Sequence, residues 1–307
     1  MARVLVTGGA GFIGSHVADA FVARGDQVLV VDDLSTGNED DVPERAELER
    51  VDVVDADSLA GVFSSFGPKL VCHLAAQASV TVSVERPERD LDVNVRGTFN
   101  VCDAARRSGA PVIFASSGGA IYGDGAPLPT PEDYPPQPLA PYGASKLAAE
   151  AYVATWGRLY GLTNVVLRLA NVYGPRQTAA GEAGVVAIFS ERLLQSKPPP
   201  LRGDGKPTRD YVHVADAARA FVSAAEGRSA GTYNVGTGRP TSTAKLLALL
   251  QEAAGTKLEP SREPLRSGEL QASAVEVTRI GEELDWHAEI ELAKGLRETY
   301  DWYRKLR

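Results

Sequence analysis

Cysteine is scarce in this sequence. Cys72 and Cys102 are the only cysteines among its 307 residues, and both stand in apolar or helical contexts. No Cys-x-x-Cys pair occurs, so no cysteine pattern indicates a zinc site or a thiol redox centre. We therefore expect two small buried thiols, a reducing compartment and no metal site.

Basic residues are also in deficit. Lys and Arg number 32 against 40 Asp and Glu, which gives a formal net charge of −8. Such a chain presents no positive field to nucleic acid or to an anionic membrane, so we expect neither as a partner. Any phosphate group must then be bound locally, by a few placed groups rather than by bulk charge.

A long apolar run is missing as well. The apolar start of MARVLVTGGAG breaks into glycines before it reaches the length of a signal peptide or a membrane span. We expect a cytoplasmic protein on this ground. The composition, 44% hydrophobic and 23% charged, is typical of a globular chain with a sizeable core and excludes collagen, coiled coil and disorder.

Short aliphatic runs alternate with longer amphipathic stretches in the first half of the chain. The expected strands are Arg3–Val6, Val28–Val31, Leu48–Val51, Leu70–His73, Val112–Ala115 and Val165–Leu169, and the expected helices are Phe12–Arg24, Ser58–Phe66, Glu85–Arg107 and Tyr142–Tyr160. Continuously apolar strands that alternate with helices predict a parallel sheet covered on both faces. The predicted fold class is α/β, a doubly wound Rossmann-type sheet with a smaller C-terminal α/β substrate-binding subdomain.

A glycine-rich turn joins the first expected strand to the first helix. The segment TGGAGFIG at 7–14 contains both the Gly-x-Gly-x-x-Gly and the Gly-x-x-Gly-x-x-Gly spacing. Glycines there let backbone amides approach a pyrophosphate at a helix N-terminus. The second strand ends at Asp32 and Asp33, where an acid would meet ribose hydroxyls and repel a 2′-phosphate. This order of elements predicts NAD rather than NADP.

Beyond residue 170 the alternation of strands and helices becomes irregular. We predict an NAD-binding Rossmann domain over 1–170, to which segments at about 205–235 return, and a mainly substrate-binding subdomain over 171–307. Seven prolines between 127 and 141 exclude a regular helix there. We expect that segment to form an ordered or mobile loop over one end of the sheet.

Tyr142 and Lys146 are one helical turn apart and share a helix face. A nearby ammonium and a positively charged nicotinamide would lower the tyrosine pKa and make the phenolate a usable general base. Taken alone, the pair fits a surface helix pair equally well. Upstream, Ser116 and Ser117 follow an expected strand, either as hydroxyls at the ligand-binding edge of the sheet or as a turn or helix cap.

Nine motifs in order carry a family resemblance. They are TGGAGFIGSH at 7–16, DDLSTG at 32–37, HLAAQ at 73–77, NVRGT at 94–98, FASSGGAIYG at 114–123, PYGASK at 141–146, RLANVYGPRQ at 168–177, GDGKPTRDYVHVAD at 203–216 and NVGTG at 234–238. The chain resembles the extended short-chain dehydrogenases/reductases of the NAD-dependent epimerase/dehydratase family. Within them it is most similar to the bacterial UDP-glucose 4-epimerases, over essentially its whole length.

The resemblance implies roles for individual residues. Tyr142 would be the general base, Lys146 would hold the nicotinamide ribose and lower the tyrosine pKa, and Ser117 would bind the reacting sugar hydroxyl. NAD would be lined by Gly8, Gly11, Phe12, Ile13, Gly14, Asp32, Asp33, Ser35, Thr36, Asp52, Val53, Leu74, Ala75 and Asn94, with Tyr142 and Lys146. The UDP-sugar would meet Ser117, Tyr142, Asn171, Val185, Arg209, Arg266, Glu269 and Ser273.

Several of these residues also have plainer interpretations. Asp52 could be a solvated turn acid, Arg209 could pair with Asp210 along a strand, and Arg266 could be an ordinary loop residue. Family members usually have Asp where this chain has Glu269. His213 is best explained as a buried histidine whose hydrogen bonds are satisfied.

The implied reaction inverts C4 of a UDP-hexose. Tyr142 would take the C4-hydroxyl proton while hydride passes from C4 to NAD, the 4-keto sugar would turn over, and hydride would return to its opposite face. Gly118-Gly119 offers no carboxylate for the elimination step of a 4,6-dehydratase. Thr178 stands where uronate-acting relatives carry a second Arg, although Arg176 keeps UDP-glucuronate open as a substrate.

Other possibilities concern the range of substrates and the assembly. The small side chain of Ser273 could admit N-acetylated hexoses. A further reductase activity of the same family and a non-catalytic NAD-sensing module are the remaining alternatives, and the latter would have lost Tyr142 or Lys146. The helices expected at 85–107 and 142–160 would pair with their copies in a homodimer, or simply pack on the sheet.

Overall fold

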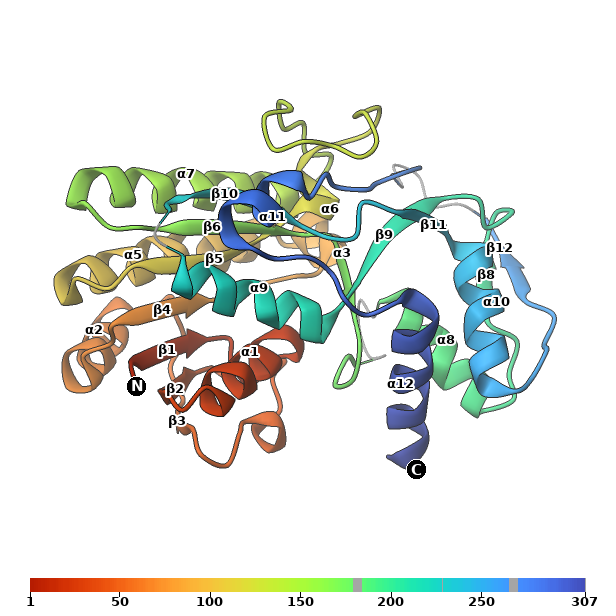
Figure 1. The fold of residues 1–307 in the computed structure, drawn as a ribbon, viewed down its shortest axis with the longest axis horizontal. Helices are drawn as coiled ribbons and strands as arrows, with labels where there is room; N and C mark the ends of the chain where they lie inside the picture. The colour runs from red at the N-terminus through yellow and green to blue at the C-terminus, as the bar shows by residue number, and fades with distance from the viewer. Residues whose placement is uncertain (179–183, 228, 265–269, 307) are drawn as a thin grey trace.

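A seven-stranded parallel sheet forms the centre of the molecule (Figure 1). The computed structural model describes residues 1–178, 184–227, 229–264 and 270–306. In spatial order the strands are β10 (Gly231–Val235), β6 (Val165–Leu169), β5 (Val112–Ser117), β4 (Leu70–His73), β1 (Arg3–Thr7), β2 (Gln27–Val31) and β3 (Glu47–Glu49). The predicted doubly wound α/β fold class is confirmed.

Helices cover both faces of this sheet because alternate strand residues point to opposite sides. The covering helices are α1 (Phe12–Ala23), α2 (Ala56–Phe66), α5 (Gly97–Ser108), α7 (Pro141–Tyr160) and α9 (Val214–Glu226). Val4 and Val6 of β1 lie in one apolar core with Phe21 of α1, whereas Leu5 lies in another with Val153 of α7. In Figure 1, α1 and α9 lie side by side against the sheet.

The helix predicted over 85–107 is found from Pro87 to Ser108, where the chain is helical throughout, but it starts two residues later than expected and contains a π-helical turn. The structure has α3 (Val80–Glu85), α4 (Pro87–Leu91), a π-helical turn η2 (Asp92–Arg96) and then α5. Pro87 has no N–H to donate, and Arg86 before it adopts φ −138° and ψ 66°, so the helix stops there and starts again. On both sides of the break the chain packs against α7, through α3, α4, the π-helical turn and α5.

The later part of the chain adds two small sheets. They contain β11 (Pro240–Ser242), β9 (Thr208–His213) and β7 (Asn171–Tyr173) in one, and β12 (Ser261–Glu263) and β8 (Pro200–Arg202) in the other. The remaining helices are η1 (Glu39–Asp41), α6 (Gly118–Ile121), α8 (Val185–Leu194), α10 (Thr243–Ala254), α11 (Thr278–Leu284) and α12 (Leu292–Lys305). Late residues therefore reach the large sheet through β10, while the domain boundaries stay a prediction.

Hydrogen bonds hold the proline-rich segment in place above the sheet, where it projects in Figure 1. The Thr130 amide donates to the Ala274 carbonyl at 2.8 Å, and the Glu276 amide donates to the Thr130 carbonyl at 2.9 Å. The Glu132 carboxylate accepts a hydrogen bond of 2.8 Å from the backbone amide of Asn234 in β10. The segment is thus tied to two later parts of the chain.

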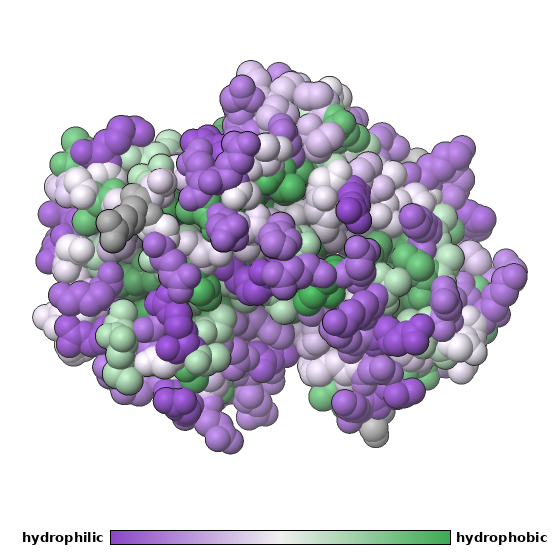
Figure 2. Space-filling model, viewed as in Figure 1, coloured by the Kyte–Doolittle hydropathy of each residue, from purple (hydrophilic) through white to green (hydrophobic). Residues whose placement is uncertain are grey.

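Hydrophilic side chains cover most of the face shown in Figure 2, and hydrophobic ones gather there only in small groups. Across the described part of the chain, no helix is both long and apolar enough to span a bilayer. Cys72 and Cys102 are buried free thiols, as predicted, and burial raises the pKa of Cys102 to about 12.

Candidate active site

The glycine turn is folded so tightly that side chains are excluded from it. Gly8 adopts φ +69°, and its amide donates to the Val31 carbonyl at 2.8 Å. A Cβ on Gly14 would lie 2.0 Å from the Gly8 oxygen, and one on Gly8 would lie 2.5 Å from the Ala75 nitrogen. The turn therefore brings the predicted residues Gly8, Gly14 and Ala75 together.

The start of helix α1 suits an anion such as a pyrophosphate. Gly11 is the N-cap and offers no side-chain acceptor, and no acidic residue occupies the first turn. Backbone amides at a helix N-terminus, including those of Phe12 and Ile13 here, lack intrahelical acceptors. Together with the side-chain-free turn, this end of α1 fits the diphosphate of NAD.

The two acids after β2 occupy different environments. Asp32 is buried, and its carboxylate accepts hydrogen bonds from the Ala10 amide at 3.0 Å and the Leu34 amide at 2.9 Å. Burial raises the pKa of Asp32. Asp33 is exposed and accepts from the Ser35 amide and hydroxyl at 2.9 and 2.7 Å, beside the exposed Thr36. Asp32 thus braces the glycine turn, and the ribose contacts of both acids stay predictions.

Three more of the predicted NAD-lining residues lie near this turn. Asp52 is exposed and accepts from the Val54 amide at 2.9 Å, which is the geometry of the turn acid considered above. Val53 beside it is buried. Leu74 follows β4 and donates its amide to the Thr7 carbonyl at 3.0 Å.

Asn94 is buried in the π-helical turn, where protein groups engage its side chain. Its Oδ1 accepts from the Gln77 amide at 2.9 Å. Its Nδ2 donates to the Gln77 carbonyl at 2.9 Å, to Asp90 Oδ1 at 3.0 Å and to Ser145 Oγ at 3.1 Å. Asn94 therefore connects the loop after β4 with α7, and its contact with NAD stays a prediction.

Ser117, Tyr142 and Lys146 meet at the carboxyl edge of the sheet. The side chains of Tyr142, at the start of α7, and Ser117, at the end of β5, come within hydrogen-bonding reach of each other. Lys146 is only 3% exposed, and its Nζ donates to the Ala115 carbonyl at 3.0 Å. The interpretation as a surface helix pair is therefore wrong.

Burial dominates the ionisation of this pair. It raises the pKa of Tyr142 to about 12; the hydrogen bond from Ser117 works against this rise and the charge of Asp90 adds to it. Burial also lowers the pKa of Lys146 to about 8, while the charges of Asp90 and Glu150 oppose that change. The lowering of the Tyr142 pKa that was predicted beside an ammonium and a nicotinamide is thus not found in the protein by itself, because burial outweighs the hydrogen bond from Ser117.

A buried charged network beneath the pair escaped the sequence reasoning. Ser116 donates to the Glu150 carboxylate, and Arg168 Nη2 lies 2.7 Å from Glu150 Oε2. Arg168 Nη1 also donates to the Tyr122 hydroxyl at 2.9 Å and to the Glu132 carbonyl at 3.0 Å. The one sequence signal was the position of Glu150, a helical turn after Lys146, because Arg168 comes from a different strand.

On the side predicted for substrate, Asn171 has an unusual feature. Its Oδ1 is buried and has no hydrogen-bond partner within the described ranges. A Cβ on Gly119 would lie 3.4 Å from this oxygen, so the amide faces the turn that follows Ser117. Since a buried polar atom needs a partner, Asn171 is suited to a polar ligand group.

The other predicted substrate residues are spread over the later elements. Val185 opens α8, and Ser273 is buried with its amide donating to the Thr208 carbonyl at 3.1 Å. Arg209 lies on β9 and donates to the Thr208 carbonyl at 2.8 Å. Arg266 and Glu269 lie outside the described residues.

The Asp210 carboxylate points to the turn after β10. It accepts hydrogen bonds from the amides of Thr237 at 2.9 Å and Gly238 at 3.0 Å, and from the Val275 amide at 3.4 Å. This is a brace between late segments rather than the strand ion pair with Arg209 that was considered above.

Two further sequence interpretations need correction. His213 is buried, but only its Nδ1 is hydrogen-bonded, by the Ala215 amide at 3.3 Å; its Nε2 has no partner among the residues described. Arg176 was considered as a partner for a uronate carboxylate. Instead its Nη1 lies 2.6 Å from Asp19 of α1, and its Nε lies 3.7 Å from Asp41 of η1.

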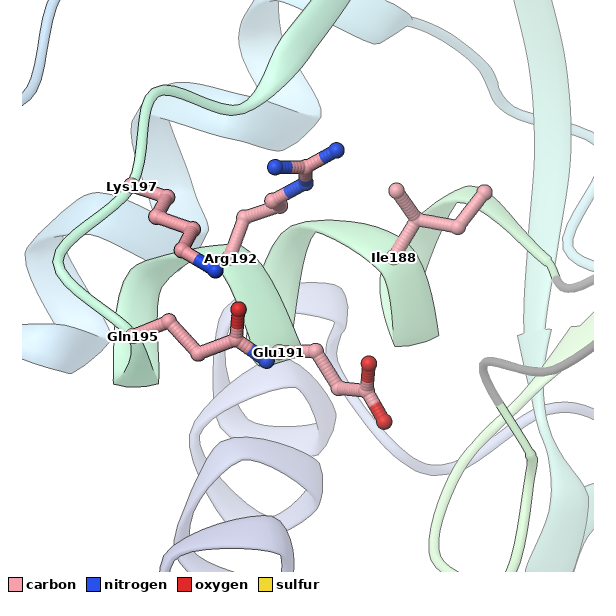
Figure 3. A pocket seen from close by; sticks show the side chains of 5 residues that line it. All are labelled: Ile188, Glu191, Arg192, Gln195 and Lys197. Carbon is pink, nitrogen blue, oxygen red and sulfur yellow. The ribbon is translucent and has the colours of Figure 1, made fainter.

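A shallow surface pocket of about 350 Å³ lies at the C-terminal half of α8 (Figure 3). It is lined by Ile188, Glu191, Arg192, Gln195 and Lys197, and none of the predicted site residues is among them. In the part of the chain that the structure describes, no group of three or more His, Cys, Asp or Glu residues could hold a metal ion.

Comparisons with known proteins agree with this geometry. The family model described as "NAD dependent epimerase/dehydratase family" matches residues 4–236. A UDP-glucose 4-epimerase of Mycolicibacterium smegmatis is 44% identical over 98% of each chain. The UDP-glucose 4-epimerase of Thermotoga maritima, solved with UDP-glucose, matches with a TM-score of 0.97 and 43% identity over 99% of each chain. The UDP-glucose 4-epimerase of Thermus thermophilus, solved in complex with NAD, matches with a TM-score of 0.93 and 45% identity over 98% of this chain and 99% of that one. The protein belongs to the NAD-dependent epimerase/dehydratase family.

Proposed function

We propose that the protein is an NAD-dependent UDP-glucose 4-epimerase, which interconverts UDP-glucose and UDP-galactose through a 4-keto intermediate. The observation that carries this proposal is the convergence of Ser117, Tyr142 and the buried Lys146 at the carboxyl edge of the sheet. Ligands bind at this edge in doubly wound folds. Similar proteins solved with UDP-glucose and with NAD support the same pair of ligands.

The chain's own residues would hold NAD and move one proton. The turn at Gly8 and Gly11 and the first amides of α1 would bind the diphosphate, with Lys146 beside the nicotinamide ribose. Bound NAD supplies reversible hydride acceptance at C4 of the sugar.

Proton transfer falls to the tyrosine. Tyr142 Oη would take the proton of the C4 hydroxyl and return it to the C4 oxygen when hydride comes back to the sugar. Ser117 would hydrogen-bond the C4 oxygen as well. Because burial holds Tyr142 as a phenol in the protein alone, it needs positive charge nearby to ionise. Lys146 provides one such charge.

The structure argues against two other reactions. A 4,6-dehydratase needs an acid and a base just after the strand-end hydroxyl, but a Cβ on Gly118 would lie 2.9 Å from Val275 Cγ1 and 3.1 Å from the Arg168 oxygen. A side chain at that position would require the neighbours to move. UDP-glucuronate loses support because Arg176 is engaged by Asp19. A neutral hexose is the substrate class that remains.

Contacts with the nucleotide part of the substrate are proposed for Asn171, Val185 and Arg209, and for Arg266 and Glu269 in the segment beyond the described residues. Arginine suits diphosphate because its fork of N–H donors matches phosphate oxygens. Ser273 is small and buried, and we propose that the protein also accepts N-acetylated hexoses. A Ser273→Tyr variant should then lose activity on UDP-N-acetylglucosamine while it keeps activity on UDP-glucose.

A homodimer through α5 and α7 is part of the proposal. Phe99 of α5 and Tyr152, Trp156 and Tyr160 of α7 form a cluster of edge-on and tilted ring contacts, in which Phe99 and Tyr152 are each 39% exposed and Tyr160 is 47% exposed. Exposed aromatic groups of this kind are typical of interfaces. Light scattering after size exclusion measures the assembly, and a monomer at micromolar concentration would contradict it. Cytoplasmic localisation stays a prediction.

One experiment tests the main proposal. Purified protein is incubated separately with UDP-glucose, UDP-galactose, UDP-N-acetylglucosamine and UDP-glucuronate, and the products are separated by chromatography. We expect interconversion of the first two, and a loss of about 10²–10⁴-fold in kcat for Tyr142→Phe. Bound NAD without inversion of any of the four sugars would favour the non-catalytic NAD-binding module instead. Full activity of Tyr142→Phe would contradict the proton-transfer role.

A further inference from the structure

Asp90 differs from the other charged residues of its region. It is 1% exposed, whereas its neighbours Glu85, Arg86, Glu88 and Arg89 on α3 and α4 are all exposed. Like α3 before it and α5 after it, α4 packs against α7. A carboxylate on this helix is therefore placed inside the protein, beside the helix that carries Tyr142 and Lys146.

Hydrogen bonds tie Asp90 to the first turn of α7. Its Oδ1 accepts from Gln77 Nε2 at 2.8 Å and from Asn94 Nδ2 at 3.0 Å. Asn94 Nδ2 also donates to Ser145 Oγ at 3.1 Å, and Ser145 Oγ donates to the Tyr142 carbonyl at 3.0 Å. A chain of side-chain contacts thus runs from the buried carboxylate to the backbone of the proposed base.

The charge of Asp90 needs a counterpart, since burying a carboxylate costs free energy unless it is compensated. The hydrogen bonds above come from two neutral amides. Lys146 is the buried cation on α7, and the negative charge of Asp90 is felt at both Lys146 and Tyr142.

Each of the other titratable groups around Tyr142 and Lys146 has a partner of its own. Glu150 on α7 is engaged by Arg168 of β6 at 2.7 Å. His73 on β4 is fully buried between the hydroxyls of Thr7 and Thr98, and burial lowers its pKa to about 3, which keeps it neutral. Asp92 on the π-helical turn pairs with Arg96 at the surface.

We propose that Asp90 is a positioning residue for the Tyr142–Lys146 pair: its buried carboxylate keeps the Lys146 side chain protonated and, through Asn94 and Ser145, fixes the first turn of α7. The proposal rests on the proposed function, in which Tyr142 moves the proton and Lys146 is its cationic partner. The negative charge of Asp90 also disfavours ionisation of the Tyr142 phenol. Asp90 therefore stabilises the charged form of Lys146 and the neutral form of Tyr142.

The direct test is a titration of Lys146 in the ligand-free protein. The side-chain NMR signal of Lys146, assigned with Lys146→Arg, is followed against pH in wild type, Asp90→Asn and Asp92→Asn. Loss of a nearby negative charge destabilises the ammonium, so the pKa of Lys146 should fall by about 0.5–1 unit in Asp90→Asn. Asp92→Asn removes the same charge from the 43%-exposed surface side chain and should change nothing. An unchanged Lys146 pKa in Asp90→Asn overturns the proposal.

A second measurement separates positioning from mere stability. In Asp90→Asn, both limbs of the bell-shaped kcat/KM profile against pH should move to lower pH, because Tyr142 and Lys146 both lose a negative neighbour. A lower melting temperature with an unmoved profile would mean a structural role only and would also overturn the proposal. If the amide does not fold, Asp90→Ser removes the same charge with a smaller side chain.

The two proposals fail in different ways. If wild type converts no UDP-sugar but the Lys146 titration moves as expected, the proposed function fails and the electrostatic role of Asp90 stands. If wild type is an active epimerase and neither the titration nor the profile moves, only the role of Asp90 fails.

Discussion

The two ends of the candidate active site, the glycine turn and the Tyr142–Lys146 pair, use different chemical groups. The turn at Gly8–Gly14 presents backbone, with no room for a Cβ on Gly14 and no acid in the first turn of α1. The catalytic end instead depends on the buried side chains of Asp90, Lys146, Glu150 and Arg168. Backbone amides keep their partial charge at every pH, but the glycine turn that presents them has no room for an added side chain. The charge of a buried ionisable side chain depends on its protonation and on its partners. Changes at the two ends should therefore have different effects on stability and on NAD binding.

Arg168→Met should have the largest effect, on the charged end. It leaves the buried Glu150 carboxylate without its cation, and breaking such a pair costs about 3–5 kcal/mol of unfolding free energy. Urea denaturation measures this loss. The double variant Glu150→Gln/Arg168→Met removes both charges and should recover part of the stability. A double variant no more stable than the single one would contradict the electrostatic explanation.

Gly14→Ala comes next, on the backbone end. The added Cβ would lie 2.0 Å from the Gly8 carbonyl oxygen, so the turn must open. We expect a loss of about 3 kcal/mol in stability and of co-purifying NAD, measured by thermal unfolding and by chromatography of the released nucleotide. Wild-type NAD content in this variant would show that the turn does not have to close this tightly.

Lowering the pH should reduce the free energy of unfolding by a smaller amount, through His73, which lies between the two ends. His73 joins Thr7, just before the glycine turn, to Thr98 of α5. Its pKa is about 3 in the folded protein, against 6.5 for a histidine exposed to water, so below pH 6.5 the unfolded state binds one more proton. Stability should therefore fall by about 2 kcal/mol from this group between pH 7 and pH 5. Denaturant titrations of wild type and His73→Gln should show the shallower slope in the variant; equal slopes would contradict this.

Gly61→Ala should have the smallest effect and serves as the control for Gly14→Ala. Gly61 lies on the exposed side of α2, where an added Cβ meets nothing within 4 Å. Alanine is favoured over glycine in a helix, so stability should rise by about 1 kcal/mol or less, with NAD content unchanged. A loss of NAD here would mean that the glycine effect is not specific to the turn.

The strands of the large sheet were predictable because continuous apolar runs must be buried on both faces. The expected strands at Leu70–His73 and Val165–Leu169 have the same bounds in the structure, and the other four differ by one or two residues at their ends. The helix expected at 85–107 runs from Pro87 to Ser108 and differs at its start, because Pro87 has no N–H to continue the preceding helix. Helical periodicity alone did not show the π-helical turn at Asp92–Arg96.

The site residues divide in the same way. The glycine spacing and the Tyr142–Lys146 spacing are local, and the structure keeps both as expected. The ion pairs of Arg176 were not predictable, because Asp19 and Asp41, its partners, lie more than a hundred residues earlier in the chain. The partners of Arg168 and Asp90 were likewise not predicted: Arg168 lies inside an expected buried strand, but Glu150, which it pairs with, lies on a different element.

The order of strands and helices, the glycine turn and the placement of a phenol and an ammonium on one helix face could be predicted from the sequence, since each depends on residues a few positions apart. The burial of Lys146, the rise of the Tyr142 pKa to about 12 and the positions of Asp90 and Glu150 near the pair depend on the tertiary structure. Protonation depends on desolvation and on charges within a few ångströms, and α4, β5 and β6 supply these from distant parts of the chain.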